Sequence, residues 1–274
     1  MPTHRQDQQA GPENEPHKAR HMAESFGTDP ARYDRTRPRY PDTLVERIVT
    51  AAPGPDVLDV GCGTGIAARQ FRAAGCAVLG VDVDARMAAF ARGTGLTVEV
   101  GAFETWDAAG RTFDAVVAGQ TWHWIDPAAG AAKAVDVLRP GGRLALFWNV
   151  FRPAPEIADA FSDAHRRALP DAPRNPWARH APDAYAAVFA KVADGLRATD
   201  GFGEPEEWRF DWERTYARDE WLEQLRTSGE AGQYTPEQTA ELLARTGAVI
   251  DAVGGAFTMP YTAVVLTAAR TGAA

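Results

Sequence analysis

Residues 57–65, with the sequence VLDVGCGTG, constrain the fold more than any other segment of this chain. A predicted buried strand over 57–60 runs into a turn that contains Gly61, Gly63 and Gly65, and a helix is predicted over 64–74. Glycine tolerates positive φ and has no Cβ, so a ligand can lie directly on the backbone of such a turn. The segment therefore predicts an α/β sheet with a ligand site at the carboxyl end of its first strand.

The rest of the chain alternates predicted strands with predicted helices. The strands are apolar on both faces, which is typical of a doubly wound, mostly parallel sheet covered by helices on both sides. After residue 150 the pattern changes, and the chain is expected to end in two more strands. Further strands are predicted at 77–81, 96–100, 113–118, 143–150, 206–215 and 257–268, and helices from about Pro41 and at 84–92, 128–138, 218–227 and 236–253.

Four segments follow from this pattern. Residues 1–24 are polar and are predicted to be a disordered tail. Residues 25–150 are expected to form the ligand-binding core, and residues 204–274 to complete its sheet. Residues 151–203 are interpreted as a helical cap insertion over the site, because they contain two apolar helical stripes. The first stripe is Ile157, Phe161, Ala164 and Ala168, and the second is Tyr185, Val188, Phe189, Val192 and Leu196.

Composition limits the partners. The 274 residues carry 29 basic and 37 acidic side chains, a net charge of −8, so nucleic acid is not expected as a partner. No apolar run reaches the roughly 18 residues of a membrane span, and no secretory signal is recognised. Cys62 and Cys76 lack metal-ligand spacing and are interpreted as reduced thiols, and no metal site is expected. We expect a cytoplasmic monomer or homodimer that acts on a small molecule.

The spacing of the glycines bears on the kind of ligand. Dinucleotide-binding loops read G-x-G-x-x-G, whereas here Ile66 stands in the position of the third glycine. Asp59, just before the turn, would repel a pyrophosphate but can hold a cationic amino group. Asp82 ends the second strand, where a carboxylate can accept hydrogen bonds from ribose hydroxyls. These features fit a ribose-bearing ligand with a positively charged amino-acid end.

On these residues the chain resembles the class I, Rossmann-like methyltransferases that use S-adenosylmethionine. Residues 59–65 are similar to their first motif, Asp82 to their ribose-binding acid, residues 113–117 to their fourth strand, and residues 138–144 to the turn before their fifth strand. The resemblance implies S-adenosylmethionine as cofactor, S-adenosylhomocysteine as product, and Cys62, Val83 and Met87 as further cofactor contacts. Many members carry Asp-Ala after the third strand. Here Ala102 and Phe103 stand there, so the Phe103 backbone, its ring or Glu104 is expected to contact adenine.

Two further segments resemble the type 11 subgroup that includes the trans-aconitate methyltransferases. Residues 33–41, YDRTRPRYP, are similar to an N-terminal segment that closes over the cofactor. The resemblance implies that Tyr33 and Arg37 contact the cofactor, with Arg37 pairing with its carboxylate. In the alternative, Tyr33, Tyr40 and the arginines only pack the first helix onto the sheet. Arg35 and Arg39 are expected to be solvated.

The second segment, residues 119–124 (GQTWHW), follows the fourth strand, where methyl donor and acceptor should meet. Gln120 is expected to contact the methionine part of the cofactor. His123 is a candidate general base or hydrogen-bond donor, with Tyr33 as a second candidate base. In the alternative, His123 is a buried histidine bonded to backbone. Trp122, Trp124, Trp148 and Trp177 are expected in or near the mouth of the site, although at least half of the eight tryptophans should only pack the core.

The predicted reaction is methyl transfer to a small acceptor, with a carboxylate favoured because a carboxylate needs no base. Some cap arginines are candidates for binding an acidic acceptor, although most should be solvated; they are Arg152, Arg166, Arg167, Arg174 and Arg179. Two alternatives stay open at this point. One is a nicotinamide-dependent oxidoreductase, and the other is a binding module that holds the cofactor without transferring its methyl group.

Overall fold

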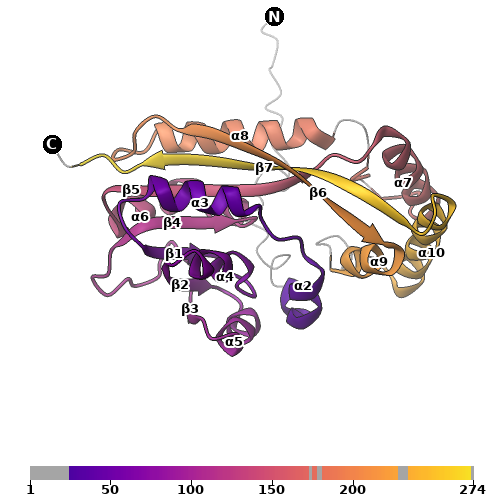
Figure 1. Cartoon of the computed structure of the whole chain (residues 1–274), viewed down its shortest axis with the longest axis horizontal. Helices are drawn as coiled ribbons and strands as arrows, with labels where there is room; N and C mark the ends of the chain where they lie inside the picture. Colours follow the sequence, from indigo (N-terminus) through magenta and orange to yellow (C-terminus); the bar gives the residue numbers. More distant parts are fainter. Residues whose placement is uncertain (1–24, 173–174, 178–180, 228–233, 273–274) are drawn as a thin grey trace, which may run out of the picture.

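A computed structural model describes residues 25–172, 175–177, 181–227 and 234–272. In this part of the chain seven strands form one sheet, in the order β3-β2-β1-β4-β5-β7-β6 (Figure 1). β1 to β5 run parallel, and β7 runs antiparallel to both of its neighbours. The predicted seven-stranded, mostly parallel α/β sheet is thereby confirmed. The strands are β1 Asp56–Val60, β2 Ala77–Asp82, β3 Thr97–Val100, β4 Phe113–Gly119, β5 Leu138–Phe151, β6 Glu206–Ala217 and β7 Ala256–Ala269.

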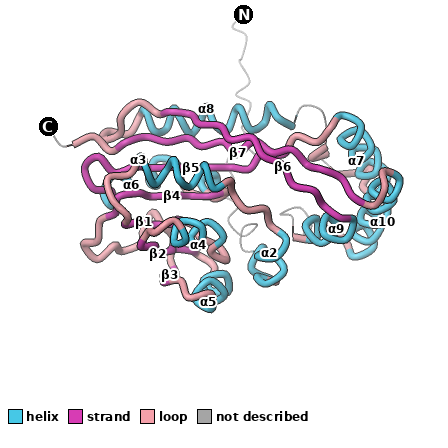
Figure 2. Tube along the Cα trace, in the orientation of Figure 1, coloured by secondary structure: helices cyan, strands magenta, loops and turns pink. Residues whose placement is uncertain are grey.

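The central strands are buried on both faces because helices cover both faces (Figure 2). In β4, Val116 and Ala118 pack into one hydrophobic cluster, and Ala115 and Val117 pack into the other. The same alternation holds in β5, as expected for side chains that point to opposite faces in turn. Residues of α3 (Asp42–Ala51) and α4 (Ile66–Ala73) cover one face, and residues of α6 (Pro127–Val137) and α8 (Ala181–Arg197) cover the other.

The site is positioned by the strand order. The chain places β2 and β3 on one side of β1, and then β4 and β5 on the other side. The carboxyl ends of β1 and β4 therefore flank the point where the order reverses, which is where ligands bind in sheets of this type. Helix α5 (Ala85–Gly93) follows β2 and packs on β3, so Ala88 and Ala91 share a cluster with Leu96 and Val98.

The long strands β6 and β7 extend beyond the parallel part of the sheet and carry a second region, which we call the distal lobe. It comprises α7 (Pro155–Ala168), α9 (Arg218–Arg226) and α10 (Pro236–Ala252), gathered at one end of the strands (Figure 1). An aromatic cluster fills this lobe: Phe161, Trp177, Tyr216, Trp221, Phe257 and Tyr261. The two helices predicted within 151–203 both form, but α8 packs on the sheet and α7 in the distal lobe.

Some predicted boundaries change. β5 begins at Leu138 and not at residue 143. Leu138 already pairs with Phe113 of β4, and the residues around Gly141 then form a bulge before pairing resumes between Arg143 and Ala115. The segment before α3 contains a short helix, α2 (Pro30–Thr36), that was not predicted; Asp29 caps it. Two single turns of 3-10 helix, η3 (Ser25–Thr28) and η4 (Trp122–Trp124), were also not predicted.

The predicted disordered tail, residues 1–24, lies outside the described residues. Among the described helices, none is long and apolar enough to cross a bilayer.

Candidate functional site

The glycine turn is held between β2 and the segment after β4. The backbone N–H groups of Gly61 and Cys62 donate to the Val81 carbonyl oxygen at 2.7 and 3.2 Å. The Thr121 hydroxyl donates to the Gly61 carbonyl oxygen at 3.1 Å. Gly61 has a φ of +63°, and a Cβ there would stand 2.0 Å from Thr121 Cγ2. Only glycine fits this position, because the turn packs directly against the Thr121 side chain.

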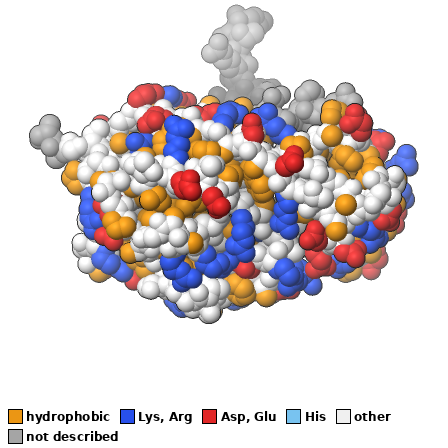
Figure 3. All heavy atoms as spheres, viewed as in Figure 1, with side chains coloured by type: hydrophobic (Ala, Val, Ile, Leu, Met, Phe, Trp, Pro, Cys, Tyr) orange, Lys and Arg blue, Asp and Glu red, His pale blue; other side chains and the backbone are white. Residues whose placement is uncertain are grey.

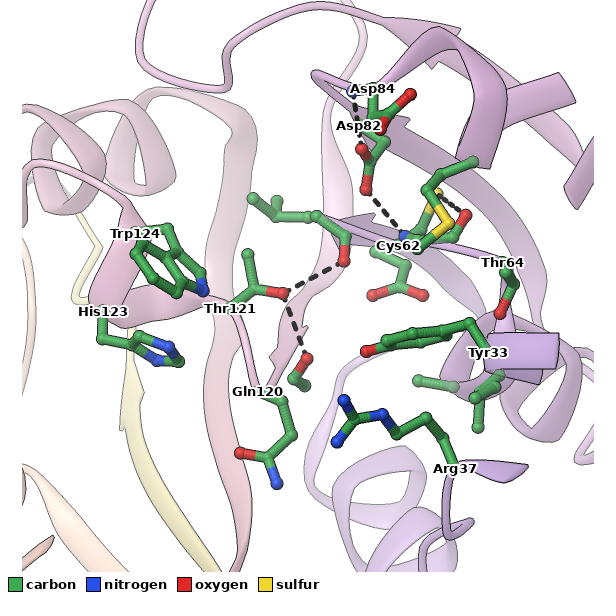
Figure 4. Close-up of a pocket in the computed structure, with 18 of the residues that line it drawn as sticks. Tyr33, Arg37, Cys62, Thr64, Asp82, Asp84, Gln120, Thr121, His123 and Trp124 are labelled. Carbon is green, nitrogen blue, oxygen red and sulfur yellow. Dashed lines mark hydrogen bonds between the residues drawn. The ribbon is translucent and has the colours of Figure 1, made fainter. Parts of the chain in front are cut away.

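Two buried carboxyl groups lie beside this turn. Asp82 accepts hydrogen bonds from the Gly63 N–H at 2.7 Å and from the Asp84 N–H at 2.8 Å, one at each oxygen (Figure 4). Asp59 is 1% exposed, and its Oδ2 has no hydrogen-bond partner. Burial, with the nearby Asp82 charge, raises the pKa of Asp59 to about 8, and a backbone hydrogen bond at Ala68 lowers it only in part. Burial also raises the pKa of Asp82. An orphaned buried oxygen beside an open cavity favours a cationic ligand group.

Gln120 follows β4 in a backbone conformation that is uncommon for a residue with a side chain, with a φ of +57°. Its N–H donates to the Phe147 carbonyl oxygen at 2.8 Å, and its Nε2 donates to the Asn149 carbonyl oxygen at 3.3 Å. Neighbouring β5 thus holds both ends of the residue. Such strained positions concentrate at functional sites.

His123 stands in η4, where its ring lines the cavity. The Trp148 indole N–H donates to its Nδ1 at 3.4 Å, so the proton of the neutral imidazole is on Nε2. Burial lowers the pKa of His123 to about 4. At neutral pH the side chain is therefore a hydrogen-bond donor and a poor base.

The opposite wall comes from α2, β7 and α9. In Figure 4, Tyr33 and Arg37 face Gln120 and His123 across the cavity. The Arg37 guanidinium lies 4.8 Å from the centre of the Tyr33 ring and donates to the Thr227 carbonyl oxygen at the end of α9. Tyr40 is also in the lining, but it is only 9% exposed and packs edge-on against Phe147, with ring centres 4.6 Å apart. Tyr40 therefore packs against the core and also borders the cavity, which Tyr33 and Arg37 line as well.

A single cavity of about 370 Å³ joins these groups. It is lined by most of the residues that the sequence predicted for the site: Tyr33, Arg37, Asp59, Gly61, Cys62, Gly63, Asp82, Val83, Met87, Phe103, Glu104, Gln120 and His123. Gly65 and Ala102 are not in the lining. Gly65 is the N-cap of α4 and fits closely against Leu96, and the Ala102 carbonyl accepts a bond from the Thr105 N–H. The Glu104 carboxylate accepts the Asp126 N–H at 2.9 Å, just before α6.

Several lining residues were not predicted, among them Thr121, Asn149, Phe151, Tyr185, Gln224 and Tyr261. Asn149 carried a signal, because it interrupts an otherwise apolar strand. Gln224 and Tyr261 carried none, because they lie far from any motif and reach the cavity only through the fold.

The tryptophan prediction needs correction, whereas the expectation that most of the cap arginines are solvated agrees with the structure. Of the four tryptophans expected near the mouth, only Trp124 lines the cavity. Trp122 and Trp148 are buried in the core cluster, where Trp148 contacts His123, and Trp177 packs in the distal lobe. Six of the eight tryptophans are buried, which confirms the expected packing role for at least half of them. Arg152, Arg166 and Arg167 are exposed and do not line the cavity, while Arg174 and Arg179 lie outside the described residues. Arg35 and Arg39 are exposed, as predicted.

Comparisons with known proteins agree with this geometry. Residues 58–146 match the methyltransferase domain family Methyltransf_11. An uncharacterized methyltransferase of Mycobacterium tuberculosis (strain H37Rv) is 38% identical over 135 residues, which cover 47% of this chain and 54% of that protein. Ribosomal RNA small subunit methyltransferase C of Chromohalobacter salexigens is 35% identical over 134 residues, which cover 44% of this chain and 40% of that protein.

The chain thus spans about half the length of the curated relatives it matches. A solved structure of a candidate type II methyltransferase from Anaeromyxobacter dehalogenans shares the fold, with a TM-score of 0.64 and 24% identity. This likeness covers 86% of this chain and 99% of that one. The glycine turn, the sheet order and these matches show that residues 58–146 are a methyltransferase domain of the class I, S-adenosylmethionine-dependent type.

Proposed function

We propose that this protein transfers a methyl group from S-adenosylmethionine to a small molecule, and that the accepting atom is a carboxylate oxygen. The observation that carries the proposal is the unpartnered, buried Asp59 carboxyl oxygen beside the open glycine turn. A buried carboxyl oxygen without a partner is costly, and a cationic amino group beside it would remove that cost. The amino-acid end of S-adenosylmethionine supplies such a group.

The other residues around the turn fit the remaining parts of this cofactor. Each carboxyl oxygen of Asp82 accepts one backbone hydrogen bond and has a further lone pair that can accept a hydrogen bond from a ribose hydroxyl. Phe103 and Glu104 line the cavity where the adenine contact is expected, although the Glu104 carboxylate already binds the start of α6. Arg37, the one cationic side chain in the described lining, is suited to the cofactor carboxylate.

The cofactor supplies an electrophilic methyl group on a good leaving group, so the protein contributes mainly by positioning the acceptor. His123 offers an Nε2–H donor, and the Tyr33 hydroxyl points into the same space (Figure 4). Donors of this kind orient an anionic oxygen. A carboxylate acceptor is favoured because the pKa of His123, about 4, makes this side chain a poor base for a hydroxyl or carbon acceptor.

The competing functions fit less well. A dinucleotide pyrophosphate would lie beside Asp59, and Ile66 replaces the glycine that such ligands require. A binding module without transfer activity gives no reason for a cavity that continues past Gln120 to Phe151, Tyr185 and Tyr261. A small acceptor is favoured over nucleic acid by the net charge of −8 and by the interspersed acidic and basic side chains on the face in Figure 3.

The test begins with calorimetry of S-adenosylmethionine, S-adenosylhomocysteine and NADH on the wild type and on Asp82→Asn. We expect the first two to bind to the wild type and to bind much more weakly to the variant, with circular dichroism confirming that the variant is folded. Product analysis by mass spectrometry then compares a panel of carboxylic acids with alcohols and amines. Preferential binding of NADH would overturn the cofactor assignment, and methylation restricted to alcohols or amines would overturn the carboxylate assignment.

A further inference from the structure

The acceptor side of the cavity is walled by aromatic rings that other rings hold from behind. Tyr261 stacks on Trp212, with ring centres 4.5 Å apart and planes at 14°. Phe151 lies 5.3 Å from Trp177, and Tyr185 lies 5.9 Å from Phe189. Tyr261, Phe151 and Tyr185 line the cavity, whereas the three rings behind them do not.

Hydrogen bonds fix this wall further. The Trp212 indole N–H donates to Asn149 Oδ1 at 3.2 Å, and Asn149 Nδ2 donates to the Arg39 carbonyl oxygen at 3.1 Å. The Tyr261 hydroxyl bonds the Tyr216 hydroxyl at 2.7 Å. The rings thus lose little conformational freedom when a ligand binds, so ring contacts with a flat molecule contribute most of their favourable energy to affinity.

The positions of the acidic side chains in the lining limit the charge that an acceptor can carry. The acidic groups in the lining are Asp59, Asp82, Asp84 and Glu104, which lie at the ends of β1 and β2 or after β3, and none belongs to the aromatic wall. A cationic acceptor would therefore find no carboxylate opposite it. The lining fits an acceptor of two parts. Its anionic group would lie between His123 and Tyr33, and its flat apolar part would lie against the aromatic wall.

We propose that the acceptor is a planar aromatic carboxylic acid whose ring packs against Phe151, Tyr185 and Tyr261, and that these three residues determine specificity. This inference rests on the proposed methyl transfer. All three residues lie outside the matched domain at 58–146, so the acceptor class is set by parts of the chain that the family match does not cover.

The experiment measures binding of benzoate, cyclohexanecarboxylate and benzylamine to the full chain saturated with S-adenosylhomocysteine. Benzoate and cyclohexanecarboxylate share a carboxylate and a six-membered ring, but only benzoate is flat. We expect benzoate to bind about threefold to tenfold more tightly, as the replacement of one or two ring contacts implies.

Three variants separate the contribution of the aromatic wall from that of general packing. Phe151→Leu should abolish the preference for benzoate. Phe202→Leu is the matched control, because Phe202 is also partly buried but does not line the cavity, and this variant should keep the preference. Tyr261→Phe keeps the ring and should also retain it.

Failure of the inference and failure of the proposed function give different results. If S-adenosylhomocysteine does not bind, the proposed function fails, and the inference falls with it. If S-adenosylhomocysteine binds, the inference alone is overturned by any of three results: equal binding of the two acids, no binding of either acid, or tighter binding of benzylamine than of benzoate. Loss of the preference in Phe202→Leu as well as in Phe151→Leu would also overturn the assignment of the wall.

Discussion

The two ends of the cavity are built in different ways. The cofactor end is built around backbone and short side chains at the ends of β1 and β2, and apart from Arg37 its residues fall between Asp59 and Gln120. The acceptor end brings together α2, η4, β5, β7, α8 and α9, and its lining residues extend from Tyr33 to Tyr261. A chemically constant ligand is matched by a local motif, and the variable ligand is matched by side chains that only the fold brings together.

The stability cost also differs between the ends. Asp59 keeps a buried oxygen unpaired at the cofactor end, and Gln120 stands in a strained conformation between the two ends. At the acceptor end the rings have partners behind them, and the Tyr216–Tyr261 pair satisfies both hydroxyl groups. Ligand binding should therefore depend most sharply on small changes at the cofactor end, and more gradually on changes in the aromatic wall.

The largest effect is expected for Gly61→Ala. The added Cβ would stand 2.0 Å from Thr121 Cγ2, at a φ of +63° that alanine rarely adopts. The turn must shift, and cofactor affinity should fall by at least about a hundredfold, or roughly 2.7 kcal/mol. Calorimetry with S-adenosylhomocysteine measures this loss.

Gly75→Ala is the matched control for Gly61→Ala. Gly75 also has a positive φ, +93°, but a Cβ there has no atom within 4 Å. It should cost about 1–2 kcal/mol of stability through backbone strain and leave cofactor affinity unchanged. Equal losses of affinity in the two variants would show that strain, and not the close approach of the turn to Thr121, is responsible.

The second effect is expected for Asp59→Asn, with a loss of roughly thirtyfold in cofactor affinity because a buried charge pair cannot form. In the unliganded protein the pKa of Asp59 is about 8, and a cationic amino group should lower it. Binding at pH 6.5 should therefore release about one proton, and wild-type affinity should rise with pH up to about 8. Calorimetry in two buffers of different ionisation enthalpy measures the proton. Proton release that persists in Asp59→Asn would contradict the assignment.

Asp59 should affect stability in the opposite direction: the free energy of unfolding should fall as the pH rises, whereas cofactor affinity should rise. The folded, unliganded protein keeps a proton on Asp59 between about pH 4 and 8, where the unfolded chain has lost it. The contribution of Asp59 to the free energy of unfolding should therefore fall by about 1.4 kcal/mol for each pH unit in that window. Urea unfolding should show a smaller fall with pH in Asp59→Asn than in the wild type.

These contrasts also explain how far the sequence could predict the molecule. The sheet, the helices after residue 41 and the residues from Asp59 to Gln120 at the cofactor end follow from local patterns, because each strand ends at the edge where its ligand groups lie. The unpredicted helix α2 has no strong apolar stripe. Gln224 and Tyr261 reach the cavity because β6 and β7 extend into the distal lobe, and no local spacing encodes that extension.

A smaller effect is expected for His123→Phe. The change removes the Nε2–H donor but keeps a ring above Trp148, and kcat should fall by about tenfold, as for the loss of one hydrogen bond to a charged group. Because the pKa of His123 is about 4, kcat of the wild type at saturating cofactor should be flat from pH 6 to 8. A rise in kcat centred near pH 6.5 that disappears in His123→Phe would instead identify this residue as a general base.

The smallest effect is expected in the support of the aromatic wall. Tyr216→Phe removes the hydroxyl group 2.7 Å from that of Tyr261 and should cost about 1 kcal/mol of stability. The acceptor KM should rise about twofold, because the Tyr261 ring stays stacked on Trp212 and loses only one of its restraints.

Thr215→Val is the control, since it breaks the exposed Thr215–Thr258 hydroxyl pair on the same two strands, away from the cavity. A Tyr216→Phe variant that weakens cofactor binding as much as acceptor binding would mean that the two ends of the cavity are coupled. An unchanged cofactor affinity would show that the distal lobe acts on the acceptor alone.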